Sequence, residues 1–243
     1  MDHLTVTILA AGEGKRMSSN LPKVLHLLKN RPMLVRVIET ARLLRPHKLI
    51  VITGKHDDLI QNTLKKYMFI KDIIFVKQTN PLGTGDAIKS CLSEYTDDGP
   101  VLILNGDMPL INDKILNKLI GNPNDSVLLT ANFENPQGYG RIICDNYGEL
   151  LKIVEEKDCD KDESAIQIIN TGVYKIHSLL LKEFIPKIDN DNNQKEYYLT
   201  DIIKLLKNRF FPVDTILLSE NENIYVSGVN TPEELKALES YAS

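Results

Sequence analysis

Residues 5–25 of this 243-residue chain read TVTILAAGEGKRMSSNLPKVL. The first part, Thr5–Leu9, is apolar and rich in β-branched side chains, so it predicts a buried strand. The strand runs into a loop that carries two glycines and three cations, Lys15, Arg16 and Lys23. In an open α/β sheet, ligands bind beyond the carboxyl ends of the strands. The stretch therefore predicts an α/β fold that holds the phosphates of a nucleotide at this loop.

The two glycines would let a ligand approach the backbone closely. Gly12 and Gly14 do not match the dinucleotide-binding fingerprint, because its third glycine is missing. The loop is not a P-loop either, since the glycine spacing differs and Arg16 follows the lysine in place of serine or threonine. Taken by itself, the loop is also compatible with a simple glycine turn that carries surface lysines.

Strand and helix patterns alternate through the first half of the chain. The expected strands are 5–9, 48–53, 72–78 and 101–105, and the expected helices are 32–44, 57–67, 85–95 and 113–120. The run VLILN at 101–105 has no polar face, which is typical of a strand covered on both sides. This alternation predicts a mostly parallel sheet with helices on both faces.

The pattern changes after residue 124. Three strands separated by turn residues, at 126–133, 140–145 and 149–156, predict a smaller antiparallel lobe over about 125–175. Further helices are expected at 177–188 and 198–208, followed by a strand at 222–229. A last helix should begin at Thr231-Pro232, because a capping-box sequence coincides there with proline at the first helical position.

Composition excludes several classes of protein. The net charge of −4 argues against a general nucleic-acid binder. The three cysteines form no CxxC pair, which favours reduced thiols and a cytoplasmic location. No segment approaches the roughly 20 apolar residues of a membrane-spanning helix. The sequence therefore predicts neither a nucleic-acid partner nor a membrane partner.

Two further motifs follow predicted strands. The apolar run 101–105 is followed by Gly106 and Asp107. Burying a carboxylate at the end of a covered strand costs free energy unless the carboxylate is paired or binds a metal such as Mg²⁺. The alternative is a turn-forming aspartate. The second motif, QTNPLGTGD at 78–86, places Gln78 and Thr84 beside glycines, where a planar base could lie. The alternative is that Thr84 only caps the helix that follows.

Short polar groups next to glycines suit a sugar, whose hydroxyls need several fixed donors and acceptors. Such clusters occur at 138–141, at Glu155, at 169–172 and at 196–198. Each of them taken singly is more often structural than functional. The five histidines are isolated in the sequence and form no HExxH pattern, and no GxSxG motif indicates covalent catalysis.

Taken in order, these pieces resemble the sugar-nucleotide pyrophosphorylases of the nucleotidyltransferase superfamily, and most of all the uridylyltransferase domain of bifunctional bacterial N-acetylglucosamine-1-phosphate uridyltransferases. The matching motifs are LAAGEGKRM, LPKVLH, QTNPLGTGDA, NGDMPLI, NPQGYGRI, KIVEEKD, QIINTGVY, EYYLTDII and GVNTPEEL. They extend from residue 9 to residue 235. The resemblance implies a Rossmann-like, mostly parallel sheet with helices on both faces and a small antiparallel sugar-binding lobe.

The resemblance also assigns roles to individual residues. It implies catalytic roles for Arg16, Lys23 and Asp107, and a magnesium site made by Asp107 and Asn230. The nucleotide-binding residues that it implies are Ala10, Ala11, Gly12, Gly14, Gln78, Gly83 and Thr84, and the sugar-binding residues are Gly140, Glu155, Asn170 and Tyr198.

The reaction that the resemblance implies transfers UMP from UTP to N-acetylglucosamine-1-phosphate, giving UDP-N-acetylglucosamine and pyrophosphate. The attacking phosphate oxygen is already an anion, so no side-chain base is needed. Mg²⁺ and the basic residues would neutralise the charge of the pentacoordinate centre. The same chemistry with another sugar-1-phosphate or nucleotide, such as glucose-1-phosphate or dTTP, is the first alternative. A non-catalytic, regulatory nucleotide-sugar-binding protein is the second.

We expect one nucleotidyltransferase domain over 1–243, with a nucleotide-binding part at 1–124, a sugar-binding part at about 125–230 and a C-terminal helix at 231–243. The bifunctional relatives continue into a hexapeptide-repeat acetyltransferase domain, which this sequence is expected to lack. The oligomeric state is left open, with a homodimer as one option. Lys15 and Asn105 depart from the residues common in relatives, threonine and an aromatic residue respectively.

Overall fold

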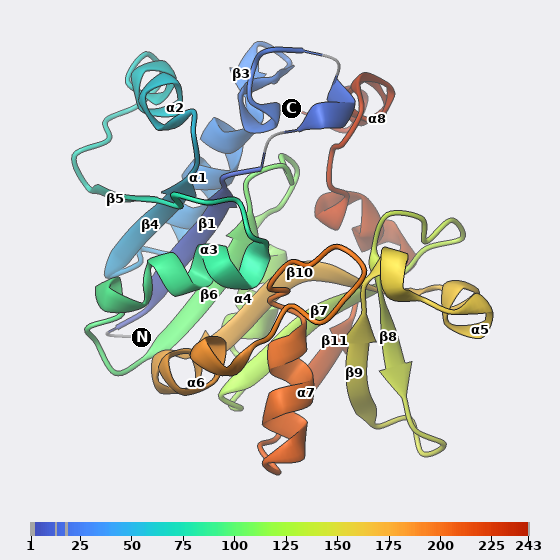
Figure 1. Cartoon of the computed structure of the whole chain (residues 1–243). Coiled ribbons are helices and arrows are strands. Elements are labelled where there is room, and N and C mark those ends of the chain that lie inside the picture. Colours follow the sequence, from blue (N-terminus) through green and yellow to red (C-terminus); the bar gives the residue numbers. More distant parts are fainter. Residues whose placement is uncertain (1–2, 13, 18, 243) are drawn as a thin grey trace.

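One mixed sheet organises the molecule (Figure 1). The computed structural model describes residues 3–12, 14–17 and 19–242. Within them the strands are β1 (Thr5–Ala10), β2 (Leu27–Leu28), β3 (Arg31–Pro32), β4 (Lys48–Thr53), β5 (Ile73–Lys77), β6 (Pro100–Asn105), β7 (Ser126–Asn132), β8 (Gly140–Cys144), β9 (Leu150–Val154), β10 (Ile168–His177) and β11 (Asp214–Leu217). The helices are α1 (Met33–Leu43), α2 (Asp57–Leu64), α3 (Thr84–Ser90), α4 (Asp113–Ile120), α5 (Lys161–Ser164), α6 (Ser178–Phe184), α7 (Asp201–Asn208) and α8 (Pro232–Leu238).

The sheet has the order β11-β7-β10-β6-β1-β4-β5. Strand β1 pairs parallel with β4 and β6, and β4 pairs parallel with β5. Strand β10 is antiparallel to both β6 and β7, while β11 is parallel to β7. The four parallel strands come from the alternating first half of the sequence, so the predicted fold class is confirmed.

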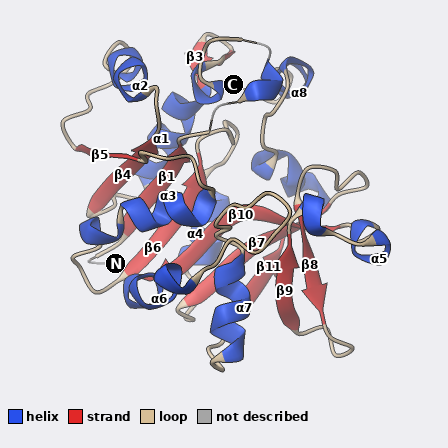
Figure 2. Ribbon diagram, in the orientation of Figure 1, coloured by secondary structure: helices blue, strands red, loops and turns tan. Residues whose placement is uncertain are grey.

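The alternation of β6 shows why both faces of the sheet are covered. Leu102 and Leu104 belong to one apolar cluster, and Val101 and Ile103 to another, because successive side chains of a strand point to opposite faces. The first cluster includes apolar residues of α1, α2 and α4, and the second includes residues of α3, α6 and α7. Figure 2 shows these helices, drawn in blue, against the red sheet.

The antiparallel lobe is continuous with the main sheet. Strands β8 and β9 form a hairpin, and β8 also pairs with β10 through Ile169–Arg141 and Asn170–Gly140. The register of β10 shifts between Asn170 and Tyr174 on its other edge, where Gly172 has φ +78°. This bulge turns the first part of β10 away from β6 and toward the hairpin.

Near the carboxyl end, one prediction was wrong and one strand was not predicted. Residues expected to form a strand at 222–229 instead form a 3₁₀ helix, Glu220–Val226. A reciprocal cap starts this helix, because Glu222 accepts a hydrogen bond from the Ser219 backbone while Ser219 caps the N3 backbone N–H. The edge strand β11, at Asp214–Leu217, was not expected; it has only four residues and no continuous apolar run.

A third apolar cluster joins the two ends of the chain. It includes Met17, Leu28 and Met33 from the first segment together with Val229 and Leu238. In Figure 1 the red helix α8 accordingly lies beside the blue segment that contains β3. The helix begins as predicted, since Pro232 is its first residue and the Thr231 side chain accepts from Glu234 N at 3.2 Å. No helix in the ranges 3–12, 14–17 and 19–242 is long and apolar enough to cross a membrane.

Candidate active site

Two adjoining pockets open at the carboxyl ends of β1 and β6. The larger has a volume of about 640 Å³ and the smaller about 180 Å³. The two pockets are neighbours, because both are lined by the same five residues: Leu9, Thr84, Asn105, Asp107 and Asn230. This is the edge of the sheet at which the sequence predicts ligand binding.

The larger pocket gathers most of the residues expected to bind the nucleotide. Its lining includes Ala11, Gly12, Gly14, Arg16, Lys23, Gln78, Gly83, Thr84, Asp107 and Asn230. Ala10 is the last residue of β1 and is buried beneath the pocket without lining it. The side chain of Lys15 lies outside the described part of the chain.

Gly14 is required where it stands. It has φ +63°, and a Cβ atom on it would lie 2.5 Å from Lys23 Cβ. Any other residue would therefore push the lysine stem away and strain the backbone. The close approach of the two segments brings the Lys23 ammonium group to the pocket.

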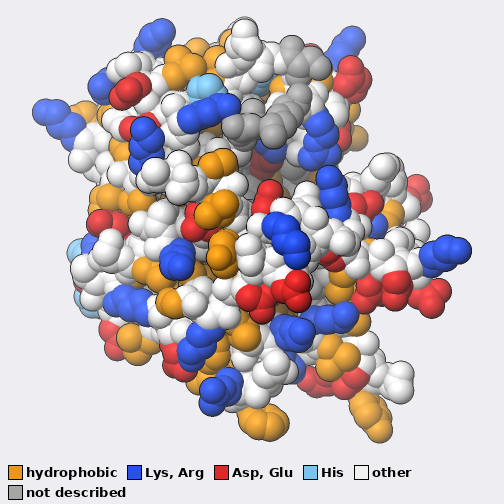
Figure 3. Space-filling view, in the orientation of Figure 1, with side chains coloured by type: hydrophobic (Ala, Val, Ile, Leu, Met, Phe, Trp, Pro, Cys, Tyr) orange, Lys and Arg blue, Asp and Glu red, His pale blue; other side chains and the backbone are white. Residues whose placement is uncertain are grey.

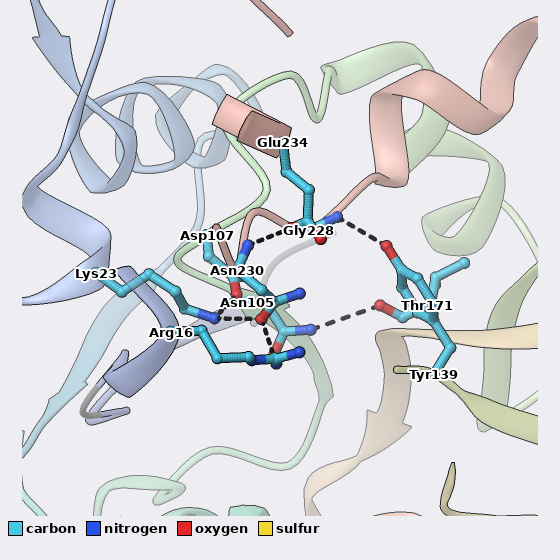
Figure 4. Close-up of polar contacts among 9 residues, drawn as sticks. All are labelled: Arg16, Lys23, Asn105, Asp107, Tyr139, Thr171, Gly228, Asn230 and Glu234. Atoms are coloured by element: carbon cyan, nitrogen blue, oxygen red, sulfur yellow. Dashed lines mark hydrogen bonds and ion pairs between the residues drawn. The ribbon is translucent and has the colours of Figure 1, made fainter. Parts of the chain in front are cut away.

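Four polar side chains converge on one point (Figure 4). Lys23 Nζ forms an ion pair with Asp107 Oδ2 and donates a hydrogen bond to Asn230 Oδ1 at 3.0 Å. Arg16 also donates to Asn230 Oδ1, at 2.9 Å. Elsewhere on the face drawn in Figure 3, acidic and basic side chains are interspersed. The two cations in the pocket are thus a local feature of a chain with net negative charge.

Asp107 and Asn230 fit a divalent cation. Their oxygens are of the kind that Mg²⁺ prefers, and both already contact the same ammonium group. Gly228 leaves room beside the carboxylate, because a Cβ atom on it would lie 3.8 Å from Asp107 Oδ1. In the described part of the chain, no group of three or more His, Cys, Asp or Glu side chains could hold a metal. A cation here would therefore depend on water and substrate phosphates for its remaining ligands.

The loop at 78–86 is fixed by its own hydrogen bonds. Gln78 Nε2 donates to Gly83 O at 3.1 Å and to Asp86 Oδ2 at 2.8 Å. Thr84 is the first residue of α3, and its hydroxyl does not cap that helix. It accepts instead from Leu199 N at 2.9 Å, so the interpretation of Thr84 as a helix cap was wrong. The threonine ties the nucleotide side of the cleft to the segment before α7.

The smaller pocket contains three of the four residues expected to bind the sugar: Gly140, Glu155 and Asn170. Asn170 is buried, and its Nδ2 donates to the Tyr174 hydroxyl at 2.7 Å. Glu155 Oε1 accepts from Thr200 Oγ1 at 2.9 Å. Burial raises the pKa of Glu155, and the Thr200 hydrogen bond opposes part of that rise.

The structure does not bring Tyr198 to either pocket. Its side chain is buried, and its hydroxyl accepts from Gln194 Nε2 at 2.8 Å. It lines a third pocket of about 570 Å³, which shares Glu155 and Thr200 with the smaller pocket of the cleft. Tyr198 therefore does not line the pocket that contains Gly140, Glu155 and Asn170.

Two lining residues of the smaller pocket, Thr200 and Gly228, were not singled out from the sequence. Tyr139 and Thr171 lie in the polar clusters at 138–141 and 169–172, but no individual role was given to them. Tyr139 is next to Gly140, and Thr200 is two residues after Tyr198. Closeness in sequence to a predicted site residue could have indicated Tyr139 and Thr200. However, the local sequence does not show which of the neighbouring side chains faces the cleft.

The chain matches the family of MobA-like NTP transferase domains over residues 6–164. It is 40% identical to a probable UDP-N-acetylglucosamine pyrophosphorylase of Acanthamoeba polyphaga mimivirus, over 98% of this chain and 95% of the relative. It is 42% identical to the bifunctional protein GlmU of Dechloromonas aromatica, over 97% of this chain and 51% of that protein. The GlmU of Coxiella burnetii gives the same identity over 98% of this chain and 51% of the relative. The chain thus spans about half the length of these bifunctional relatives.

A solved structure shares the fold. A putative glucose-1-phosphate thymidylyltransferase from Bacillus anthracis superposes with a TM-score of 0.72, covering 98% of this chain and 95% of that one. At 17% identity, this likeness concerns the fold alone. The family match and the sequence relatives together establish that this chain belongs to the MobA-like NTP transferase family and is a nucleotidyltransferase.

Proposed function

We propose that the chain transfers UMP from UTP to N-acetylglucosamine-1-phosphate, releasing pyrophosphate and UDP-N-acetylglucosamine. One observation carries the proposal: Arg16, Lys23, Asp107 and Asn230 converge where a nucleotide-sized pocket meets a smaller polar pocket. The name of the mimivirus relative, a probable UDP-N-acetylglucosamine pyrophosphorylase, supports this nucleotide sugar as the product. UTP is an intracellular metabolite, so we place the reaction in the cytoplasm.

The reaction is an in-line displacement at phosphorus. A phosphate oxygen of the sugar-1-phosphate forms the new bond to the α-phosphorus of UTP, and the bond to the bridging oxygen of pyrophosphate breaks. The nucleophile is already an anion, so no proton has to be removed from it. This agrees with the lining of the two pockets, since no histidine is found among their described residues. Catalysis then depends on positioning the two anions and on offsetting their charge.

The cations of the chain would meet the phosphates. Lys23 would contact the α-phosphate, and Arg16 would stabilise the leaving pyrophosphate. Asp107 and Asn230 would hold a divalent cation, which we propose is Mg²⁺. When bound, that ion neutralises charge on the phosphate oxygens. Because Asp107 contacts Lys23 and would also hold the ion, its carboxylate would set the position of the positive charge in the site.

The two organic groups would lie on opposite sides of this charge. The backbone of 11–12 and the loop with Gln78, Gly83 and Thr84 would hold uracil and ribose, and we leave Ala10 out because it does not line the pocket. Gly140, Glu155 and Asn170 would hold the N-acetylglucosamine group in the smaller pocket, and we leave Tyr198 out of that set. Glu155 as a carboxylate accepts hydrogen bonds, which suits the hydroxyls of a sugar.

The test is pyrophosphate release, with four nucleoside triphosphates crossed against several sugar-1-phosphates in the presence of Mg²⁺. Strong preference for UTP with N-acetylglucosamine-1-phosphate would support the proposal. Turnover of another pair would keep the mechanism and change the substrates. If calorimetry shows nucleotide binding but no pair turns over, the chain is a binding protein.

The Asp107→Ala variant should lose turnover by at least about 10³-fold, because it removes a ligand of the cation and the partner of Lys23. Its melting temperature should stay close to that of the unchanged protein, since the carboxylate is near the surface of the cleft. Asp98→Ala is a matched control, because the Asp98 side chain is 73% exposed and lies outside the cleft. Near-normal Mg²⁺-dependent turnover of Asp107→Ala would refute the metal assignment.

A further inference from the structure

The segment 228–230 is held by three separate parts of the chain (Figure 4). Gly228 N donates to the Tyr139 hydroxyl at 3.2 Å. Val229 N donates to Asp107 O at 3.0 Å, and Asn230 N donates to Glu234 Oε2 at 2.6 Å. Three successive backbone N–H groups therefore determine where the Asn230 side chain lies.

Two of the three acceptors, on Asp107 and Glu234, belong to the proposed cation site or to helix α8, which follows Asn230. Asp107 is the other proposed ligand of the cation, and Glu234 is in the first turn of α8. Tyr139 is different, because it comes from the loop that lines the smaller pocket together with Gly138 and Gly140. Its hydroxyl is thus a direct link between the proposed sugar site and the segment that carries Asn230.

Tyr139 is itself fixed in place. Its ring packs edge-on against Phe133, with ring centroids 5.1 Å apart, and its carbonyl accepts from the Arg141 guanidinium. The Arg141 side chain is buried and ion-paired with Glu156 at 2.7 Å. A displacement of the 138–140 loop would therefore be passed to Gly228 through a well-packed ring.

The hydroxyl carries its proton at neutral pH, as an ordinary tyrosine does. Burial raises the pKa of Tyr139 further; the hydrogen bond from Gly228 N opposes this rise, and nearby Asp107 adds to it. An uncharged hydroxyl accepts from Gly228 N and retains one proton to donate. Tyr139, Gly228 and Asp107 all line the smaller pocket, and a Cβ atom on Gly228 would lie 3.8 Å from Asp107 Oδ1.

We propose that Tyr139 is a positioning residue, which couples the sugar-binding loop to the metal ligand Asn230 through Gly228. The inference rests on the proposed function, because it takes Asn230 as a metal ligand. Partners that orient metal ligands commonly change metal affinity by 10- to 100-fold when they are removed. Binding of the sugar phosphate should accordingly strengthen binding of the cation, and the reverse should also hold.

The experiment measures Mn²⁺ binding by electron paramagnetic resonance, with and without N-acetylglucosamine-1-phosphate. In Tyr139→Phe the ring and its packing remain, and the acceptor for Gly228 N is lost. We expect the Kd for Mn²⁺ to rise about tenfold and the effect of the sugar phosphate on that Kd to become smaller, because only direct ligation by its phosphate remains. We also expect kcat to fall and to recover partly at high Mg²⁺, which a purely structural defect would not do.

Tyr225→Phe is the matched control, since the Tyr225 ring is likewise half-buried and packs beside the same segment. It should leave the Kd for Mn²⁺ and the melting temperature unchanged. The inference is overturned if Tyr139→Phe binds Mn²⁺ as tightly as the unchanged protein. It is also overturned if the variant only loses thermal stability and extra Mg²⁺ restores nothing.

The two proposals can fail separately. If the unchanged protein binds Mn²⁺ but turns over no substrate pair, the proposed function fails, and the comparison of Mn²⁺ affinities still decides the role of Tyr139. If turnover is normal but Tyr139→Phe behaves like the control, only the positioning role is lost.

Discussion

At the residue scale, Glu155 shows how burial and one hydrogen bond oppose each other. Burial disfavours its charged form and raises its pKa, and neighbouring carboxylates, with Asp201 the largest, act in the same direction. The Thr200 hydroxyl favours the charged form by donating to it at 2.9 Å. Thr200 is itself buried, so water cannot easily replace its hydroxyl.

Thr200→Val should therefore raise the pKa of Glu155 further. Sugar hydroxyls need the carboxylate as an acceptor, so activity is lost as the pH falls through this pKa. In the variant, the acid limb of kcat/KM for the sugar-1-phosphate should move to higher pH, and KM should rise several-fold at neutral pH. Thr200→Ser keeps the hydroxyl and should leave the profile in place. If the acid limb of the kcat/KM profile is unchanged in Thr200→Val, the assignment of Glu155 to the sugar site is refuted.

At the scale of elements, residues 82–85 at the start of α3 lie tightly against the segment before α7. Tyr197 N donates to Leu82 O at 2.7 Å, and Gly85 N donates to Tyr197 O at 2.7 Å. Gly83 lies between these bonds with φ +108°, and a Cβ atom on it would lie 2.5 Å from Tyr197 O. A side chain at this position can be accommodated only if the two segments separate.

We expect Gly83→Ala to destabilise the protein by at least about 2 kcal/mol, because it combines an unfavourable φ with a backbone clash. Gly12→Ala is the control for stability: a Cβ atom there meets nothing within 4 Å. Thermal denaturation followed by circular dichroism compares the two. Equal melting temperatures for both variants would show that the loop moves freely away from Tyr197.

On the scale of the whole molecule, the sheet does not divide where the sequence changes its pattern. Strand β10, from the second half, inserts between β6 and β7, and Tyr174 pairs with Ile103 of β6. Residues of helices α6 and α7, from the second half, share one apolar cluster with Val101 and Ile103 of β6. We therefore propose that 1–124 and 125–230 are parts of one folding unit, with the helix region 231–243 closing it.

A fragment of residues 1–124 should not fold by itself. Without β10 it would expose the edge of β6 together with apolar side chains such as Val101 and Ile103, which are buried in the whole chain. We expect no cooperative thermal transition and a tendency to aggregate, measured by circular dichroism and size-exclusion chromatography beside the full chain. A monomeric fragment with a cooperative transition would show that the first part is an independent domain.

Local patterns were enough to predict most of the fold. Apolar periodicity predicted β1, β4, β5 and β6 and the helices between them, because burial selects side chains at the period of each element. The same reasoning failed at 222–229, where a reciprocal cap outweighed the β-branched residues. It also failed for β11, whose exposed alternate residues carry little pattern.

The sequence by itself determined the parallel sheet, the glycine loop after β1 and the residue types that phosphate and a cation need. Only the tertiary structure decided which of them meet. Arg16 and Asn230 are 214 residues apart and share a hydrogen bond, while Tyr198, which the resemblance assigned to the sugar site, lines neither of the two pockets of the cleft. The physical reason is the difference in sequence separation between the two kinds of interaction. Propensity and periodicity act over a few residues, but the contacts among Lys23, Asp107 and Asn230 arise when the sheet and the third apolar cluster bring distant segments together.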